Sequence, residues 1–276
     1  MSFMQYVADL HTHSTASDGQ YAPEEVVRRG KERGLAVLAL TDHDTLAGVE
    51  TAVKAGETLG LRVLRGIEIG AAEYENLHIL GYGVALDSPV LTGLCETFKA
   101  GRDERKFRIL DYLRANSFEL TLEEVEELAG GGIIGRPHFA QAMVRRGYVK
   151  SSREAFDRWL DTEDYHQKVK RFKVPAKNCL EAIKAAGGRT SLAHPYQIGL
   201  GDGALEELVA ELKEDGLDAI ECYYPRHTPE QTAFYLRLAK QYDLHITGGS
   251  DFHGERVKPD IQLAAWELEL DWLMDI

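Results

Sequence analysis

The hydrophobic residues of this chain recur in short runs rich in β-branched side chains, and each run is followed by a stretch that resembles a helix. Short apolar runs bounded by turn residues are typical of buried strands. The pattern therefore predicts a βα repeat. Seven strands are expected, at residues 7–10, 36–41, 62–67, 77–83, 190–193, 218–222 and 245–249.

Helix signals separate the early strands and then dominate the middle of the chain. Residues 23–33 begin with Pro23, which suits a first helical turn, and residues 46–59 end before Gly60, a frequent helix terminator. After residue 83 the strands stop. Helical patterns then occupy residues 90–116, 122–129, 139–146 and 152–160. We expect an inserted helical subdomain that covers one end of a barrel.

The length of 276 residues suits one α/β barrel. We expect the barrel at residues 1–88 and 178–276 and the insertion at residues 89–177. No apolar run approaches the length that spans a bilayer, so a membrane protein is not expected. The first residues, MSFMQYVADL, lack the features of a signal peptide, and a cytoplasmic location is expected. The three cysteines lack CxxC spacing and are expected to be unpaired.

The net charge of −13 argues against broad binding to duplex DNA, which requires many Lys and Arg contacts with phosphates. The charge is distributed unevenly. Residues 99–177 contain 17 Lys and Arg against 13 Asp and Glu, whereas the rest of the chain contains 15 against 32. The acidic part should attract cations and the basic part anions.

Side chains that bind metals occur at or near the ends of most expected strands. In chain order they are His11 and His13, His43, Glu68, His78, His194, and Asp251 with His253. Residues at the carboxyl ends of barrel strands converge on one face. Imidazole and carboxylate donors suit Zn, Mn, Fe or Ni better than Ca. Such a set could bind one ion, or two or three if Glu68 bridges. Asp18, in SDG, is compatible with either a turn or a ligand.

Six motifs make the chain similar to the polymerase and histidinol phosphatase (PHP) family. They are ADLHTHSTASDG, LALTDHD, RGIEI, HILGYG, LAHP and GSDFHG, in this order along almost the whole chain. The HxH element alone is weak, because amidohydrolases and TatD-like nucleases share it. The resemblance implies a distorted (β/α)7 barrel and an enzyme that hydrolyses phosphate esters with bound metal ions.

Every ligand position that the resemblance implies is filled in this chain. It implies one ion held by His11, His13, Glu68 and Asp251, a second by Asp18, His43 and His253, and a third by Glu68, His78 and His194. Mn is the first choice of metal, with Zn or Fe as alternatives. Asp42, Asp44 and Glu221 are expected to support these ligands or to form turns.

The insertion resembles that of a narrower branch, the nucleoside 3′,5′-bisphosphate phosphatases and 5′-to-3′ exoribonucleases. The resemblance rests on IIGRPHFAQAMV and the basic stretch that follows it. Arg136 could hold a phosphate through its guanidinium, and His138 could add a donor, although GRPH is also a good helix start. His227, after the sixth strand, could bind phosphate or protonate a leaving oxygen.

The expected chemistry is direct hydrolysis, in which a hydroxide shared by two cations attacks phosphorus. The expected substrate is small and phosphorylated: a nucleoside 3′,5′-bisphosphate, which loses its 3′-phosphate, or a short 5′-phosphorylated RNA. Histidinol phosphate and cyclic nucleotides stay open within the family. A non-catalytic PHP scaffold and an amidohydrolase acting on C–N bonds are the alternatives from other classes. The sequence does not predict the oligomeric state.

Overall fold

The computed structural model describes residues 5–129, 134–170 and 172–276. Residues 1–4 of the expected barrel segment, and residues 130–133 and 171 of the expected insertion, lie outside the described residues. The chain divides into two compact units, residues 1–95 with 173–276 and residues 96–172. No helix in the described part of the chain is long and apolar enough to cross a membrane.

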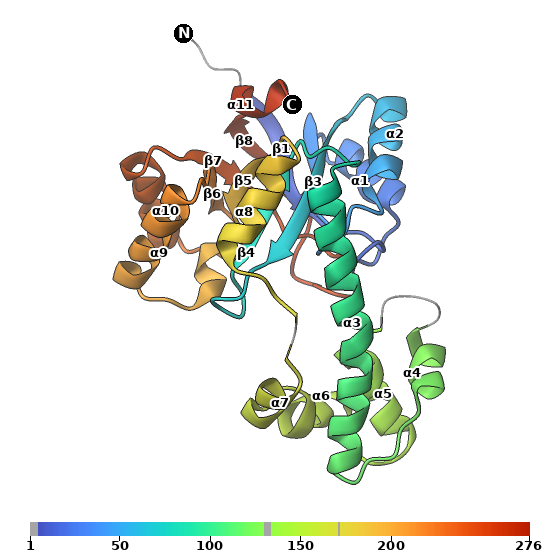
Figure 1. Ribbon diagram of the computed structural model, residues 1–276. Helices are drawn as coiled ribbons and strands as arrows, with labels where there is room; N and C mark the ends of the chain where they lie inside the picture. The colour runs from blue at the N-terminus through green and yellow to red at the C-terminus, as the bar shows by residue number, and fades with distance from the viewer. Residues whose placement is uncertain (1–4, 130–133, 171) are drawn as a thin grey trace. The chain divides into compact units, whose positions relative to one another are not determined.

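The first unit is built around one eight-stranded sheet with the order β7-β6-β5-β4-β3-β2-β1-β8. Strands β7 and β8, at the two ends of this order, lie close to each other, so the sheet forms a nearly closed barrel (Figure 1). The strands are β1 (Gln5–Thr12), β2 (Val37–Leu40), β3 (Arg62–Gly70), β4 (His78–Tyr82), β5 (Arg189–Leu192), β6 (Ala219–Tyr223), β7 (His245–Gly248) and β8 (Trp266–Glu269). The α/β barrel predicted from the sequence is confirmed.

The barrel differs from the expected repeat in two places. Strand β4 is antiparallel to both β3 and β5, because residues 71–77 are too few for a helical crossover. Strand β8, which the sequence analysis did not include, pairs antiparallel with β1 from Gln5↔Glu269 to Ala8↔Trp266. The remaining neighbours pair in parallel. The antiparallel β4 and the additional β8 are the two departures of this barrel from a regular βα repeat.

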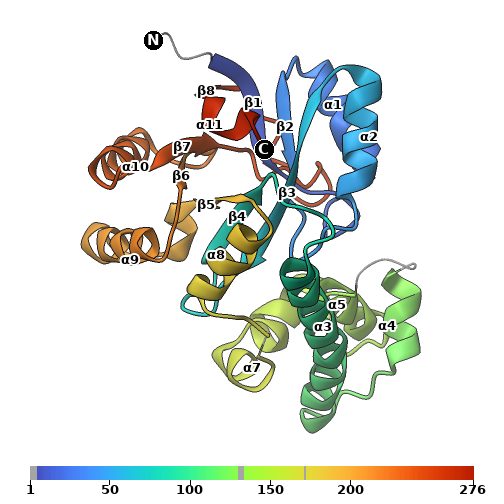
Figure 2. The ribbon, with the colours of Figure 1, turned by 45° about the horizontal axis from the view of Figure 1, so that its top comes forward.

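Helices pack around this barrel. In both Figure 1 and Figure 2, α1 and α2 lie together on one flank, and α9 and α10 lie together on another. The helices of this unit are α1 (Pro23–Glu32), α2 (Val49–Leu59), α8 (Ala176–Ala185), α9 (Asp202–Glu214), α10 (Pro229–Gln241), α11 (Asp271–Met274) and the 3₁₀ turn η2 (Pro195–Ile198). Helix α2 ends at Gly60, whose φ of 64° is the left-handed conformation expected of a terminating glycine.

Strand β2 illustrates why the barrel strands read as continuous apolar runs. All four of its residues are buried. Val37 and Ala39 belong to one hydrophobic cluster with residues of β1 and β8, whereas Leu38 and Leu40 belong to another with α1 and α2. Alternate side chains thus pack on opposite faces of the strand. The local sequence cannot alternate with polar residues because both faces are covered.

The second unit is helical and has its own core. Its helices are α3 (Pro89–Ala115), whose first residues belong to the barrel unit, α4 (Leu122–Ala129), α5 (Arg136–Arg145), α6 (Ser152–Ala155), the π-helical turn η1 (Phe156–Leu160) and α7 (Glu163–Lys168). The core includes the fully buried Phe139, Met143 and Tyr165. Helix α7 is capped at its N-terminus by Thr162, whose side chain accepts a hydrogen bond from Tyr165 N.

Candidate metal centre

Nine metal-type side chains converge in the barrel unit. They form four overlapping groups, and within each group the candidate ligand atoms lie within 4.8 Å of one another. The groups are His13, Asp18, His43 and His253; His11, Glu68 and His194; His11, His13 and Asp251; and His43, Glu68 and His78. These are the nine positions that the sequence analysis named, and the structure brings all of them together.

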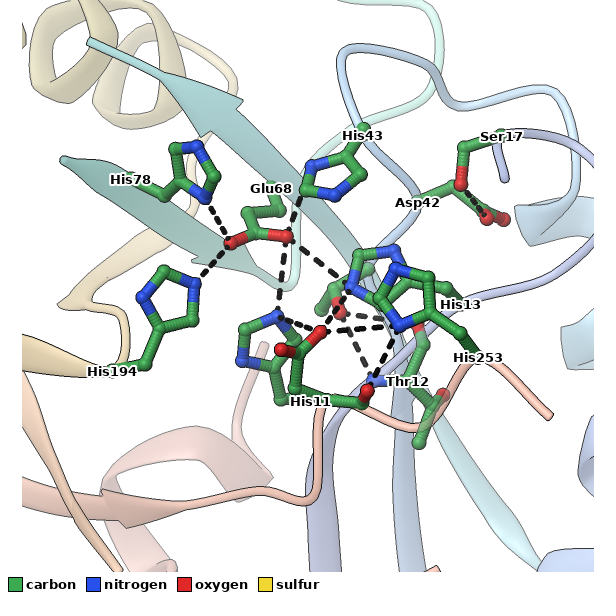
Figure 3. Close-up of polar contacts among 12 residues, drawn as sticks. His11, Thr12, His13, Ser17, Asp42, His43, Glu68, His78, His194 and His253 are labelled. Atoms are coloured by element: carbon green, nitrogen blue, oxygen red, sulfur yellow. Dashed lines mark hydrogen bonds and ion pairs between the residues drawn. The ribbon is translucent and has the colours of Figure 1, made fainter. Parts of the chain in front are cut away.

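Glu68 lies at the middle of this cluster (Figure 3). Its side chain is fully buried, and each carboxylate oxygen faces a different set of imidazoles. Oε1 lies 2.7 Å from His78 Nδ1 and 3.0 Å from His194 Nε2. Oε2 lies 3.2 Å from the Nε2 atoms of His11 and His13, and 3.0 Å from His43 Nδ1. One carboxylate therefore joins two halves of the cluster.

Several atoms of the cluster are buried without a hydrogen bond. Among the described residues, Glu68 Oε2 and the Nε2 atoms of His11 and His13 have no hydrogen-bond partner, although they lie close to one another. Leaving such groups unsatisfied costs about 1–3 kcal/mol each. The atoms converge on shared points instead of aligning as donor and acceptor pairs, and a bound cation would satisfy them together. The donor set thus fits a centre for transition metals.

Burial and the charges within the cluster shift the pKa values of its carboxylates and imidazoles. Burial alone would raise the pKa of Glu68, but His43, His11 and His78 hold it well below its usual range. Burial lowers the pKa of His78 and that of His253 to about 4. The carboxylate is therefore ionised and these two imidazoles are neutral at pH 7, which are the states that bind metals.

The pKa values of His11 and His13, at the end of β1, are shifted in the opposite direction. Burial lowers the pKa of His13, but the nearby carboxylates of Asp251 and Glu68 outweigh it and raise that pKa to about 9. Glu68 and Glu221 likewise raise the pKa of His11 well above its usual value, against the effect of burial. A proton on each imidazole takes the place of a cation among these carboxylates, because it supplies the positive charge that they attract.

Glu221, in the middle of β6, supports two of the histidines. Its Oε1 lies 3.2 Å from His11 Nδ1, and its Oε2 accepts a hydrogen bond of 2.7 Å from the His194 backbone N–H. The space for this arrangement depends on Gly249, where a Cβ atom would lie 2.2 Å from His11 Cβ and 2.8 Å from Glu221 Oε1. The glycine allows the segment after β7 to approach β1 closely.

Asp42 supports the loop that carries Asp18. It is fully buried and accepts hydrogen bonds from Ser14 N at 2.7 Å and from the hydroxyls of Ser14 and Ser17 at 2.6 Å. Asp18 itself is exposed on one side, and its Oδ1 lies 3.2 Å from His253 Nε2. Burial raises the pKa of Asp18, but His43 and His253 together hold it well below its usual range.

Backbone strain occurs at two of the nine positions. Asp251 has a φ of 58° and His194 a φ of 26°, in the left-handed region that residues other than glycine avoid. A hydrogen bond of 2.8 Å from Asp251 N to His11 O holds the first of them. Strained backbone of this kind is concentrated at functional sites, where the surrounding structure enforces it.

The three predicted substrate residues have other environments. His227 lies outside the four groups: its Nδ1–H donates to Cys222 O at 3.0 Å, its ring lies 5.2 Å from that of Tyr224, and burial lowers its pKa. In the helical unit, Arg136 donates to Asp161 and to Leu160 O. His138 Nδ1 accepts a hydrogen bond of 3.0 Å from Gly135 N.

Two residues that contact the cluster were missed by the sequence analysis. Tyr224 and Lys258 both bind the carboxylate of Asp251. Tyr224 follows β6, so its position at a strand end was a usable signal. Lys258 lies in a segment without regular structure, and the sequence contains no comparable signal for it.

Sequence comparisons connect this site to known proteins. Residues 9–169 match the PHP domain family. A 5′-3′ exoribonuclease from Haemophilus influenzae is 35% identical over 246 residues, covering 89% of each chain. A phosphoribosyl 1,2-cyclic phosphate 1,2-diphosphodiesterase from Eggerthella lenta is 34% identical, covering 90% of this chain and 95% of that protein. A 3′,5′-nucleoside bisphosphate phosphatase from Chromobacterium violaceum is 30% identical, covering 89% and 86%.

Solved structures agree with these relatives. A Chromobacterium violaceum protein described as an amidohydrolase, with bound sulfate and no metal, has a TM-score of 0.80 at 29% identity, covering 95% of this chain and 91% of its own. A Bifidobacterium adolescentis protein described as a metal-dependent phosphoesterase has a TM-score of 0.78 at 30% identity, covering 99% and 96%. The resemblance found in the sequence is therefore confirmed, and the chain belongs to the PHP domain family.

Proposed function

We propose that this protein is a metal-dependent phosphoesterase and that the nine clustered side chains hold two or three divalent cations. The observation that carries the proposal is the environment of Glu68, a fully buried carboxylate surrounded by five imidazoles. No packing function requires such a set, and buried unsatisfied groups are costly unless a ligand satisfies them. Membership of the PHP domain family supports the same conclusion.

The groups of the cluster suggest how the cations would be shared. The ligand sets that the family resemblance implies are His11, His13, Glu68 and Asp251 for one cation, Asp18, His43 and His253 for a second, and Glu68, His78 and His194 for a third. His11, His13 and Asp251 form one of the observed groups, and Asp18, His43 and His253 lie within another. Such cations would supply Lewis acidity toward a phosphoryl group and activate water near neutral pH. Mn is the metal we propose first, with Zn or Fe as alternatives: the carboxylates of the cluster suit Mn, its imidazoles suit Zn or Fe, and cellular supply selects among them.

Other residues of the chain would position the metal ligands and bind the substrate. Glu221 fixes the orientation of His11, and Asp42 fixes the loop that carries Asp18. We propose that Arg136 and His138 bind a substrate phosphate and that His227, when protonated, donates Nε2–H to a phosphate or to the leaving oxygen. For this step Arg136 would exchange part of its contact with Asp161 for the substrate.

The proposed substrate is a nucleoside 3′,5′-bisphosphate, which loses its 3′-phosphate, or a short 5′-phosphorylated RNA trimmed from the 5′ end. Relatives named for both activities, at 30% and 35% identity, support it. Sulfate, which a similar solved structure binds, is a tetrahedral dianion like phosphate. Both substrates carry one phosphate for hydrolysis and another for recognition by the basic residues of the helical unit.

A substrate panel tests this choice. Bisphosphates, mononucleotides, cyclic phosphates, histidinol phosphate and 5′-phosphorylated oligomers should be compared by kcat/KM with Mn²⁺ present. We expect the highest values for the bisphosphates or the oligomers, and inactivity on both classes would overturn the choice. A single turnover in ¹⁸O-labelled water should place the label on phosphate; label in the alcohol alone would contradict attack at phosphorus.

A second candidate activity is the hydrolysis of a cyclic phosphodiester. The relative from Eggerthella lenta is named for such an activity, and its match with this chain extends over nearly the full length of that relative. The same centre could open a cyclic ester, because attack at phosphorus is common to both reactions. The kcat/KM values for the cyclic phosphates in the panel, compared with those for the bisphosphates and the oligomers, decide between the two candidate activities.

Two alternatives from other classes have distinct signatures. A non-catalytic scaffold has no use for nine convergent donors, and it should be isolated without stoichiometric metal. An amidohydrolase should cleave amides and leave phosphoesters intact. We place the protein in the cytoplasm as part of the proposal, since its three widely spaced cysteines lack the pattern of a disulfide framework.

A further inference from the structure

The two oxygens of Asp251 have different surroundings. Oδ1 faces the cluster, at 3.3 Å from His13 Nε2 and 3.2 Å from His253 Nδ1. Oδ2 faces away from these imidazoles and accepts hydrogen bonds from Tyr224 OH at 3.0 Å and Lys258 Nζ at 2.5 Å. Asp251 thus differs from Glu68, both of whose oxygens face imidazoles.

Tyr224 is held in place by contacts of the adjacent backbone and of its hydroxyl. The end of β6 is tied to the segment after β7 by a hydrogen bond of 3.0 Å from Gly249 N to Tyr223 O, which sets Tyr224 opposite Asp251. Gln197 Nε2 donates to Tyr224 OH at 3.0 Å. Because the hydroxyl oxygen accepts from Gln197, its own hydrogen is directed to Asp251. Tyr224 is only 3% exposed, so water does not compete strongly for this bond.

Lys258 is held by a segment with several anchors. Its backbone N–H donates to Gly254 O at 2.9 Å. The neighbouring Arg256 N donates to Gln20 Oε1 at 2.8 Å, and Asp260 pairs with Arg226 at 2.8 Å. These contacts fix the segment against the loop that carries Asp18 and the loop after β6. The contact between Lys258 Nζ and Asp251 Oδ2 therefore belongs to a segment whose backbone is fixed by its neighbours.

We propose that Tyr224 is a positioning residue that, together with Lys258, restricts Asp251 to a single oxygen directed at the bound cations. Two donors on Oδ2 occupy its lone pairs and fix the plane of the carboxylate, so Oδ1 alone is available to a cation. Partners of this kind commonly orient metal ligands. The inference rests on the proposed function, since it assumes that cations bind at the cluster.

The test compares Tyr224→Phe with the control Tyr223→Phe. The neighbouring Tyr223 stacks on Trp266 with ring centroids 5.5 Å apart, and within the described residues its hydroxyl has no hydrogen bond. Each variant loses one hydroxyl oxygen and little else. Lys258 is kept in both, because removing its charge would also remove a repulsion of the cations. Binding of Mn²⁺ to the metal-free proteins is measured by the EPR signal of free Mn²⁺, without substrate.

We expect Y224F to bind Mn²⁺ at one of its sites roughly 10–100-fold more weakly than Y223F, as for other partners of metal ligands. Raising Mn²⁺ to saturation should restore its kcat on the phosphoester substrate. Equal Mn²⁺ affinity in the two variants would overturn the proposal, and so would a kcat that stays low at saturating Mn²⁺, because Tyr224 would then act on the substrate directly. Failure of the wild-type protein to bind Mn²⁺ would instead contradict the proposed function.

Discussion

The barrel unit and the helical unit both contain polar residues that the sequence analysis selected, but the two sets differ in how they are satisfied. In the barrel, Glu68 Oε2 and His13 Nε2 are buried and lack hydrogen bonds among the described residues. In the helical unit, Arg136 pairs with Asp161, and His138 Nδ1 accepts a bond from Gly135 N. Buried polar groups are normally hydrogen-bonded, so several unsatisfied atoms that face one another indicate a ligand, whereas satisfied groups are stable without one. Of the selected residues that the structure describes, those of the barrel therefore supply the structural argument for a bound cofactor.

The largest expected effect comes from removing the charge at the centre of the barrel cluster. Glu68→Gln should lower kcat on a phosphoester by roughly 10³-fold, because metal ions contribute several kcal/mol and each 1.36 kcal/mol is tenfold in rate. The substitution should also lower the number of metal ions bound per protein molecule, as measured by plasma mass spectrometry. Glu57→Gln, on the exposed surface of α2, is the matched control and should change neither quantity. A fully active E68Q enzyme would contradict the role given to this cluster.

Removal of metal should distinguish the two units directly. At a free concentration 100-fold above Kd, a bound cation stabilises the folded state by about 2.7 kcal/mol. EDTA should therefore increase amide hydrogen exchange in the segments that carry the ligands, residues 11–18 and 249–253. The amides of α5 in the helical unit should exchange as before. If the two units respond equally, the contrast between them is wrong.

A smaller effect is expected from the helical unit. Arg136→Met should raise KM for a bisphosphate by roughly 10- to 100-fold, since a hydrogen bond to a charged group contributes about 1.5–3 kcal/mol. Its kcat and Mn²⁺ affinity should not change. Arg153→Met, at an Arg whose side chain is 88% exposed, is the control. An equal rise in KM for Asp161→Asn would show that the Arg136–Asp161 pair matters for structure and would contradict direct phosphate binding.

The close approach at Gly249 gives the smallest of these effects. Gly249→Ala should destabilise the protein by about 1–3 kcal/mol, the usual range for added volume in a packed site, because its Cβ would overlap His11. Thermal unfolding measures this change in stability, and the amount of metal bound per protein molecule should also decrease. Gly203→Ala in α9 is the control, because a Cβ there has no atom within 4 Å. Equal unfolding temperatures for the two variants would refute the steric account.

The sequence predicted most of the barrel and all members of the candidate cluster. His11, His43, Glu68 and Asp251 were found because strand ends of a parallel barrel converge, a rule that requires no knowledge of side-chain contacts. Strand β8 was missed because its four residues, WELE, are too few to establish a period. The antiparallel β4 could have been inferred, since the link at residues 71–77 is too short for a crossover.

The contacts of Tyr224 and Lys258 could not be predicted in the same way. The first depends on the register between β6 and the segment after β7, set by the hydrogen bond from Gly249 N to Tyr223 O. The second depends on an irregular segment anchored at Asp260. Both are properties of tertiary packing and leave no periodic signal in the chain.

The most direct measurement of the central claim is the anomalous scattering of crystals of the full chain grown with Mn²⁺. Two or three peaks should lie among the nine clustered side chains, with at least two of them in contact with Glu68. An absence of peaks at this cluster, or a single peak that leaves Glu68 without a cation, would contradict the account.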